Sequence, residues 1–198
     1  MITLNLERFK EIDITQRDND QYKTRACLPS SAAIAIDFLC PDFRKSIGCQ
    51  TADWLVRKCL SLTEEEKKEI IEINKSSWMF DDPSFELFQA IPIEAYVIKK
   101  YIYKNVWPMW RCQYSDILDS INRGIPIVCL GNFSPISTIG GHYNCTVGYN
   151  KESNTVINMD TWGNGNTNYK DKNGFAVEYD WKIFLIEQGL YGYGLWFK

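Results

Sequence analysis

The hydrophobic pattern of the chain changes from helical to strand-like after Gly124. Before that residue, apolar side chains recur at helical spacing; after it, short runs rich in β-branched and aromatic residues are separated by Gly, Asn or Ser. Helices first and strands afterwards predict an α+β fold, with N-terminal helices packed on a C-terminal antiparallel sheet. A chain of 198 residues that is 45% hydrophobic can bury one sizeable core, so we expect a single domain over residues 1–198.

Helical patterns fill most of the chain before Gly124. The tract from Leu28 to Leu39 is apolar almost all round, which predicts a core helix with Pro29 in its first turn. We expect residues 1–26 to be irregular and DDP (81–83) to form a turn. Further helices are expected at TADWLVRKCLSL (51–62), TEEEKKEIIEI (63–73, opened by a capping box), IEAYVIKKYIY (93–103) and YSDILDSINRG (114–124). Strands are expected at IPIVCLG (125–131), GHYNCTVGYN (141–150) and NTVINMD (154–160), with one or two more in GFAVEYDWKIFLI (174–186) and YGYGLWFK (191–198).

Composition argues against several classes of function. The net charge is −3 and the charges are spread along the chain, so no surface for nucleic acid is expected. Neither a run of about 18 apolar residues nor a signal peptide is readable, so we expect cytoplasmic synthesis and no membrane span. Seven cysteines without a CxxC pair give no disulfide framework. With one histidine and no glycine-rich phosphate loop, we expect neither a metal nor a cofactor.

Cys27 stands directly before the predicted core helix. The free N–H groups and the positive end of the helix dipole favour the thiolate there, as a nucleophile requires. A buried structural cysteine would occupy the same place equally well.

His142 is the only imidazole in the chain, and therefore the only candidate for a base that titrates near neutrality. If the strands around 141–150 and 154–160 pair as a hairpin, Asp160 lies across from His142 or from Asn144. Asp160 would then hold the ring and leave its other nitrogen for the thiol, with Asn158 as the fallback. The alternatives are a histidine without catalytic role and an aspartate that only forms a turn.

Attack on a carbonyl also requires hydrogen-bond donors for the oxyanion. The backbone N–H of Cys27 is one candidate. A side-chain amide from the preceding loop is another, and the residues alone leave Gln16 and Gln21 equally open.

Several blocks together resemble a known family. They are TQRDND, CLPSSAAIAIDFL, GIPIVCL, GGHYNCTVGYN and VINMDTWGNG. In this order they look like the papain-like cysteine peptidases related to the bacteriocin-leader-processing family, of which similar single-domain proteins occur in phages and bacteria. The resemblance covers about 14–40 and 115–170, whereas the helical segment 41–114 matches no part of it.

The resemblance implies a papain-like fold and a role for each site residue. Cys27 would be the nucleophile, His142 the general base and acid, Asp160 the orienting carboxylate and Gln16 the preferred oxyanion donor. The sequence departs from the family at two positions. Leu28 replaces a glycine and is expected to narrow the cleft beside the thiol, and Thr161 replaces the proline that usually follows the aspartate.

The sequence therefore predicts a cysteine peptidase that acts on peptide or amide bonds. The expected substrate is peptidoglycan peptides, which the protein would cleave as a phage-type lysin that reaches the cell wall by a separate release route. We expect the protein to be a monomer. The alternatives are a peptide transferase that uses the same residues and an inactive papain-like binding module. In the latter, exposed tryptophans would form the recognition surface; the candidates are Trp78, Trp107, Trp110 and Trp162.

Overall fold

The computed structural model describes residues 1–12, 14–81, 86–184 and 193–198. Within these ranges helices precede most of the strands, and the strands form one antiparallel sheet, which confirms the α+β prediction. The α-helices are α1 (Leu6–Lys10), α2 (Cys27–Leu39), α3 (Pro41–Ile47), α4 (Thr51–Leu60), α5 (Glu64–Asn74), α6 (Trp78–Asp81), α7 (Ile91–Tyr101) and α8 (Tyr114–Asn122). The strands are β1 (Ile2–Thr3), β2 (Val106–Met109), β3 (Ile127–Asn132), β4 (Gly141–Asn150), β5 (Thr155–Met159), β6 (Val177–Asp180) and β7 (Gly194–Phe197). Short 3-10 helices are η1 (Gln16–Asp18), η2 (Leu87–Gln89), η3 (Gly165–Thr167) and η4 (Trp181–Phe184).

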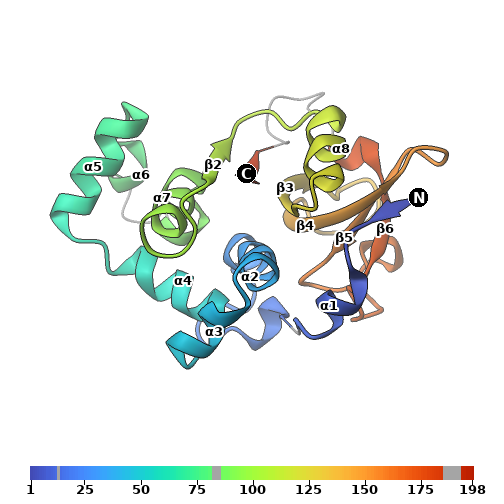
Figure 1. Cartoon of the computed structure of the whole chain (residues 1–198), viewed down its shortest axis with the longest axis horizontal. Helices are drawn as coiled ribbons and strands as arrows, with labels where there is room; N and C mark the ends of the chain where they lie inside the picture. Colours follow the sequence, from blue (N-terminus) through green and yellow to red (C-terminus); the bar gives the residue numbers. More distant parts are fainter. Residues whose placement is uncertain (13, 82–85, 185–192) are drawn as a thin grey trace.

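Helix α2 lies between a helical part of the molecule and the sheet (Figure 1). It packs against α4 on one side and β4 on the other, and almost all of its side chains are buried. This burial agrees with the nearly uniform apolar composition of the helix. Because α2 contacts both parts, the position of its first residue is set by the whole core.

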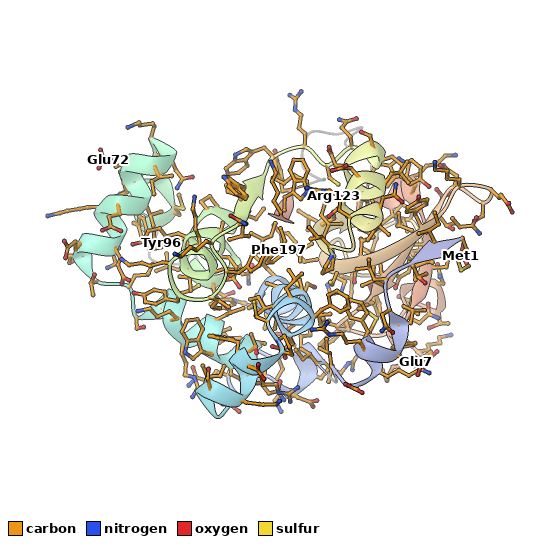
Figure 2. All side chains as sticks on the ribbon, viewed as in Figure 1. Met1, Glu7, Glu72, Tyr96, Arg123 and Phe197 are labelled. Carbon is orange, nitrogen blue, oxygen red and sulfur yellow. The ribbon has the colours of Figure 1, made fainter. Side chains whose placement is uncertain are left out.

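The sheet has the strand order β2-β7-β3-β4-β5-β6, and β1 pairs with β4. Helix α8 packs on β3 and β4, and α7 packs along β2 (Figure 1). Two strands thus come from the part of the chain that was expected to supply only irregular or helical structure. Glu72 on α5 and Met1, directly before β1, lie at opposite ends of the molecule, while the fully buried Phe197, the last residue of β7, lies near the middle of the view (Figure 2).

The N-terminal segment is more ordered than the sequence predicted. Instead of an irregular stretch over 1–26, it contains β1, α1 and η1. The amide N–H of Leu4 bonds to the carbonyl of Val147, and Phe9 stacks on Phe38 with ring centroids 4.4 Å apart. These partners are more than twenty residues away in sequence, so local composition gave no sign of them. Of the turn expected at 81–83, positions 82 and 83 lie outside the described residues.

Candidate active site

Cys27 is the first residue of α2, and its side chain is partly exposed. The preceding residue, Ala26, has no side chain that can cap the helix. The N–H of Ala26 instead bonds to the carbonyl of Tyr22 at 2.9 Å, which closes a tight turn into the helix. The first N–H groups of α2 therefore remain available beside the thiol.

His142, the second residue of β4, is 3% exposed. Its ring meets Phe133 edge-on at a centroid distance of 5.6 Å and Tyr169 at 6.0 Å. Gly131 lies opposite His142 in the β3–β4 register. A Cβ at Gly131 would come within 2.8 Å of the Phe133 ring, so the glycine leaves the space in which that ring packs beside the imidazole.

Asp160 holds the imidazole. Its Oδ1 lies 2.9 Å from Nε2 of His142 and also accepts the N–H of Trp162 at 2.9 Å. Its Oδ2 accepts the hydroxyl of Tyr179 at 2.6 Å and that of Tyr169 at 3.4 Å. With Nε2 occupied by Asp160, Nδ1 is the ring nitrogen left for a second partner.

The pKa values of Cys27 and His142 shift in opposite directions. Burial alone would raise the pKa of the Cys27 thiol, but the hydrogen bond and charge of His142 and the backbone N–H groups of Tyr143 and Leu28 lower it overall. Burial would lower the pKa of His142, but the charge and hydrogen bond of Asp160, with a further contribution from Cys27, raise it to about 10. Both shifts favour a thiolate beside an imidazolium.

Gln16 is 3% exposed and lies in η1. Its Nε2 donates to the carbonyl of Lys23 at 3.2 Å, and its Oε1 accepts the hydroxyl of Thr161 at 2.9 Å. The amide thus lies between the turn that leads into Cys27 and the residue that follows Asp160. Gln21, the other open candidate, is exposed.

The register decides between the positions considered for Asp160. Strand β4 pairs with β5 through Cys145 opposite Met159, so continuing the pairing by one residue brings Asp160 opposite Asn144, with His142 as the next residue on the same face. Asn158 does not take the role of fallback, because its side chain bonds to Thr146 at 2.7 Å and to its own strand.

The expectation that Leu28 narrows the cleft beside the thiol is wrong. Its side chain is completely buried in the hydrophobic core. Successive side chains of a helix point about 100° apart, so Leu28 can face the core while the neighbouring Cys27 stays partly exposed.

Three residues of the site were not found by sequence reasoning: Thr161 was noted only as a departure, and Tyr169 and Tyr179 were not considered. The tyrosines reach Asp160 from the segment after η3 and from β6. A buried carboxylate requires hydrogen-bond donors for both oxygens. This requirement predicts that donors to Asp160 exist, but it does not predict which residues supply them.

The sequence matches the Peptidase_C39 like family over residues 11–184. The chain belongs to the Peptidase_C39 like family. The papain-like resemblance is thereby confirmed, and the matched range includes the helical segment 41–114. No curated protein matched the chain.

Other sequence-based expectations for this Peptidase_C39 like protein concern its tryptophans, a membrane span and a metal site. Trp107 of β2 and Trp110 are 38% and 51% exposed, whereas Trp162 is half-buried under the guanidinium of Arg17, which lies 3.9 Å from its ring centroid. The side chain of Trp78 is outside the described part of the chain.

Within the described ranges, no helix is both long and apolar enough to span a membrane, and no group of three acidic, His or Cys side chains is arranged to hold a metal ion.

Proposed function

We propose that this protein is a cysteine peptidase that hydrolyses amide bonds with Cys27 as nucleophile, His142 as general base and acid, Asp160 as orienting carboxylate and Gln16 as oxyanion donor. One observation carries the proposal. The Cys27 thiol lies at the start of a buried helix, and its pKa is lowered by a hydrogen bond to the imidazole of His142. The Nε2 atom of that imidazole lies 2.9 Å from the carboxylate of Asp160. Membership of a peptidase family supports the same conclusion.

In the first half-reaction, the Cys27 thiolate attacks the carbonyl carbon and a C–S bond forms. The electron pair of the carbonyl moves to its oxygen, which the backbone N–H of Cys27 and the Nε2–H of Gln16 stabilise. The C–N bond then breaks, and protonated His142 transfers its proton to the leaving amine. A thioester on Cys27 and a free amine result.

In the second half-reaction, neutral His142 takes a proton from water, and the hydroxide adds to the thioester. The C–S bond breaks, the carboxylic acid leaves and the thiolate returns beside the imidazolium. Asp160 keeps the ring in one orientation through both steps, because its Oδ1 is hydrogen-bonded to Nε2 and leaves Nδ1 for the sulfur.

Alkylation with iodoacetamide at neutral pH tests the nucleophile. We expect rapid labelling of Cys27 that is lost in Cys27→Ala. Cys40→Ala is the matched control, because Cys40 lies at the other end of α2, is also partly exposed, and has a pKa raised by burial and by the charge of Asp37. Undiminished rapid labelling in Cys27→Ala, at another cysteine, would contradict the assignment.

Peptidoglycan stem peptides are the substrate class to test first, following the sequence expectation of a phage-type lysin. Turbidity of host cell walls should fall with the wild-type protein and not with Cys27→Ala. The net charge of −3 opposes tight binding to anionic walls, so the assay needs ionic strength as a variable. Intact muropeptides after long incubation would reject this substrate but not the chemistry.

Two further outcomes distinguish the alternative functions. If an added amine acceptor appears in the product, the thioester is released by transfer rather than by water. If Cys27 is labelled but no amide is cleaved from a mixed peptide library, the protein is a binding module that retains a reactive thiol.

A further inference from the structure

The Gln16 side chain is held at both ends by groups from distant parts of the chain. The hydroxyl of Thr161 donates to Oε1 at 2.9 Å, and Nε2 donates to the Lys23 carbonyl at 3.2 Å. Gln16 is 3% and Thr161 is 2% exposed, so water does not compete freely for these bonds. The amide therefore has one defined plane and one defined direction.

The Thr161 hydroxyl and the Lys23 carbonyl together select the direction of the Gln16 amide. If the amide were flipped, Oε1 would face the Lys23 carbonyl oxygen, and two acceptors would repel each other. An amide nitrogen carries two hydrogens, and only one is used by Lys23. Within the described part of the chain, Nε2 of Gln16 has no second acceptor, so one N–H remains for a substrate oxygen.

Thr161 is well placed to control this amide, because its backbone is fixed by the same segment. Its carbonyl accepts the N–H of Gln16 at 3.1 Å and the hydroxyl of Thr15 at 3.0 Å. Thr161 also follows Asp160 directly. The adjacent residues Asp160 and Thr161 thus hold the imidazole and the amide, respectively, so one segment positions both.

We propose that Thr161 is a positioning residue, whose hydroxyl orients the Gln16 amide so that its free N–H points at the oxyanion. This inference rests on the proposed function. It gives a role to a residue that replaces the proline usual in the family that the sequence resembles, since proline carries no hydroxyl group.

Two reactions of Cys27 separate orientation of the amide from reactivity of the thiol. Acetylation by p-nitrophenyl acetate forms a C–S bond through a tetrahedral oxyanion and then releases p-nitrophenolate. Alkylation by iodoacetamide displaces iodide and forms no such oxyanion. A residue that acts only on the oxyanion donor changes the first rate and leaves the second unchanged.

In Thr161→Val, we expect the acetylation rate of Cys27 to fall about 10-fold, because loss of a complete oxyanion donor costs about 10²–10³-fold and the Lys23 bond remains. The alkylation rate should not change. Thr161→Ser should restore acetylation, since it retains the hydroxyl. Thr161→Ala is measured in parallel, because it removes the hydroxyl without placing a methyl group against Gln16.

The matched control is Thr146→Val. It removes a buried threonine hydroxyl that donates a hydrogen bond to a different side-chain amide oxygen, Oδ1 of Asn158, at 2.7 Å. Acetylation should be unchanged in this variant. In the background of Gln16→Ala, Thr161→Val should have no further effect, whereas an effect through general stability would persist.

Acetylation at the wild-type rate in both Thr161→Val and Thr161→Ala overturns the inference. So does an equal fall of acetylation and alkylation, which would mean that Thr161 acts on the Cys27–His142 pair or on the fold. These results differ from failure of the proposed function itself, in which the wild-type protein shows no acetylation of Cys27 or in which Cys27→Ala reacts as fast as the wild type.

Discussion

Oδ1 of Asp160 lies 2.9 Å from Nε2 of His142, while Oδ2 of the same carboxylate accepts the hydroxyl of Tyr179 at 2.6 Å. Tyr179 thus holds the carboxylate through Oδ2, and the carboxylate in turn holds the imidazole through Oδ1. Since Asp160 is 6% exposed, water contributes little to holding it. The ring orientation depends on a network that reaches from β4 to β6.

Removal of the imidazole should raise the apparent pKa of Cys27. In His142→Ala the lowering interactions with the ring disappear, and burial, which raises the pKa, remains. The pH at which iodoacetamide labels Cys27 at half its maximal rate should therefore move upward. Mass spectrometry of the labelled peptide measures it, with Cys40 as the internal reference because its pKa is set by burial and Asp37. An unchanged midpoint for Cys27 would show that His142 does not act on the thiol.

Asp160→Asn should lower amide hydrolysis by about 10²-fold or more, the size of a general acid–base contribution. An asparagine keeps the shape but removes the charge that raises the pKa of His142. The imidazolium then loses its proton at lower pH, so the alkaline limb of the pH–rate profile should move toward neutral pH. Asp42→Asn is the control, since the Asp42 side chain is 91% exposed. A fall in rate without movement of that limb would argue against an electrostatic role.

Tyr179→Phe should reduce the free energy of unfolding by about 1–3 kcal/mol, because the buried carboxylate and the N–H of Gly165 both lose their partner. Tyr169→Phe is the matched comparison and should have the smaller effect, since its hydroxyl lies 3.4 Å from the same oxygen. Urea denaturation measures both variants. A larger loss of unfolding free energy in Tyr169→Phe than in Tyr179→Phe would show that the Tyr169 hydroxyl stabilises the Asp160 carboxylate more strongly.

Glu94→Gln should make stability less dependent on pH. Glu94 is fully buried in α7, accepts the Cys59 thiol at 3.3 Å, and has a pKa raised by burial from 4.5 to about 8. The pKa of Glu94 is higher in the folded chain than in the unfolded chain. In the pH window from 4.5 to about 8, the folded chain therefore binds more protons than the unfolded chain. The stabilising contribution is complete below 4.5 and is lost as the pH rises through about 8.

The difference in unfolding free energy between Glu94→Gln and the wild type isolates this group, since Cys27 and His142 titrate in both proteins. We expect the difference to grow in favour of the variant by about 1.36 kcal/mol per pH unit within the window. Urea denaturation at several pH values between about 5 and 7.5 measures it. A difference that does not vary with pH would mean that Glu94 has the same protonation state in the folded and unfolded chains.

Much of the fold was predictable because the strongest signals are local. The capping box at Thr63 and Glu66 forms as expected at the start of α5. Strand β4 spans the stretch from Gly141 to Asn150 that its composition predicted. The N-terminal strand and helix were missed, because short elements are stabilised mainly by distant partners such as Val147.

For the candidate site, the sequence by itself determined which chemical groups were available: one imidazole, a cysteine before an apolar helix, and an aspartate at the end of a strand. These follow from residue type and local pattern. Only the tertiary structure decided that Asp160 rather than Asn158 meets His142, that Leu28 is buried in the core, and that Thr161 meets Gln16. Such contacts join residues up to 145 positions apart, and hydrogen bonds depend on distance and angle in space, which no local pattern specifies.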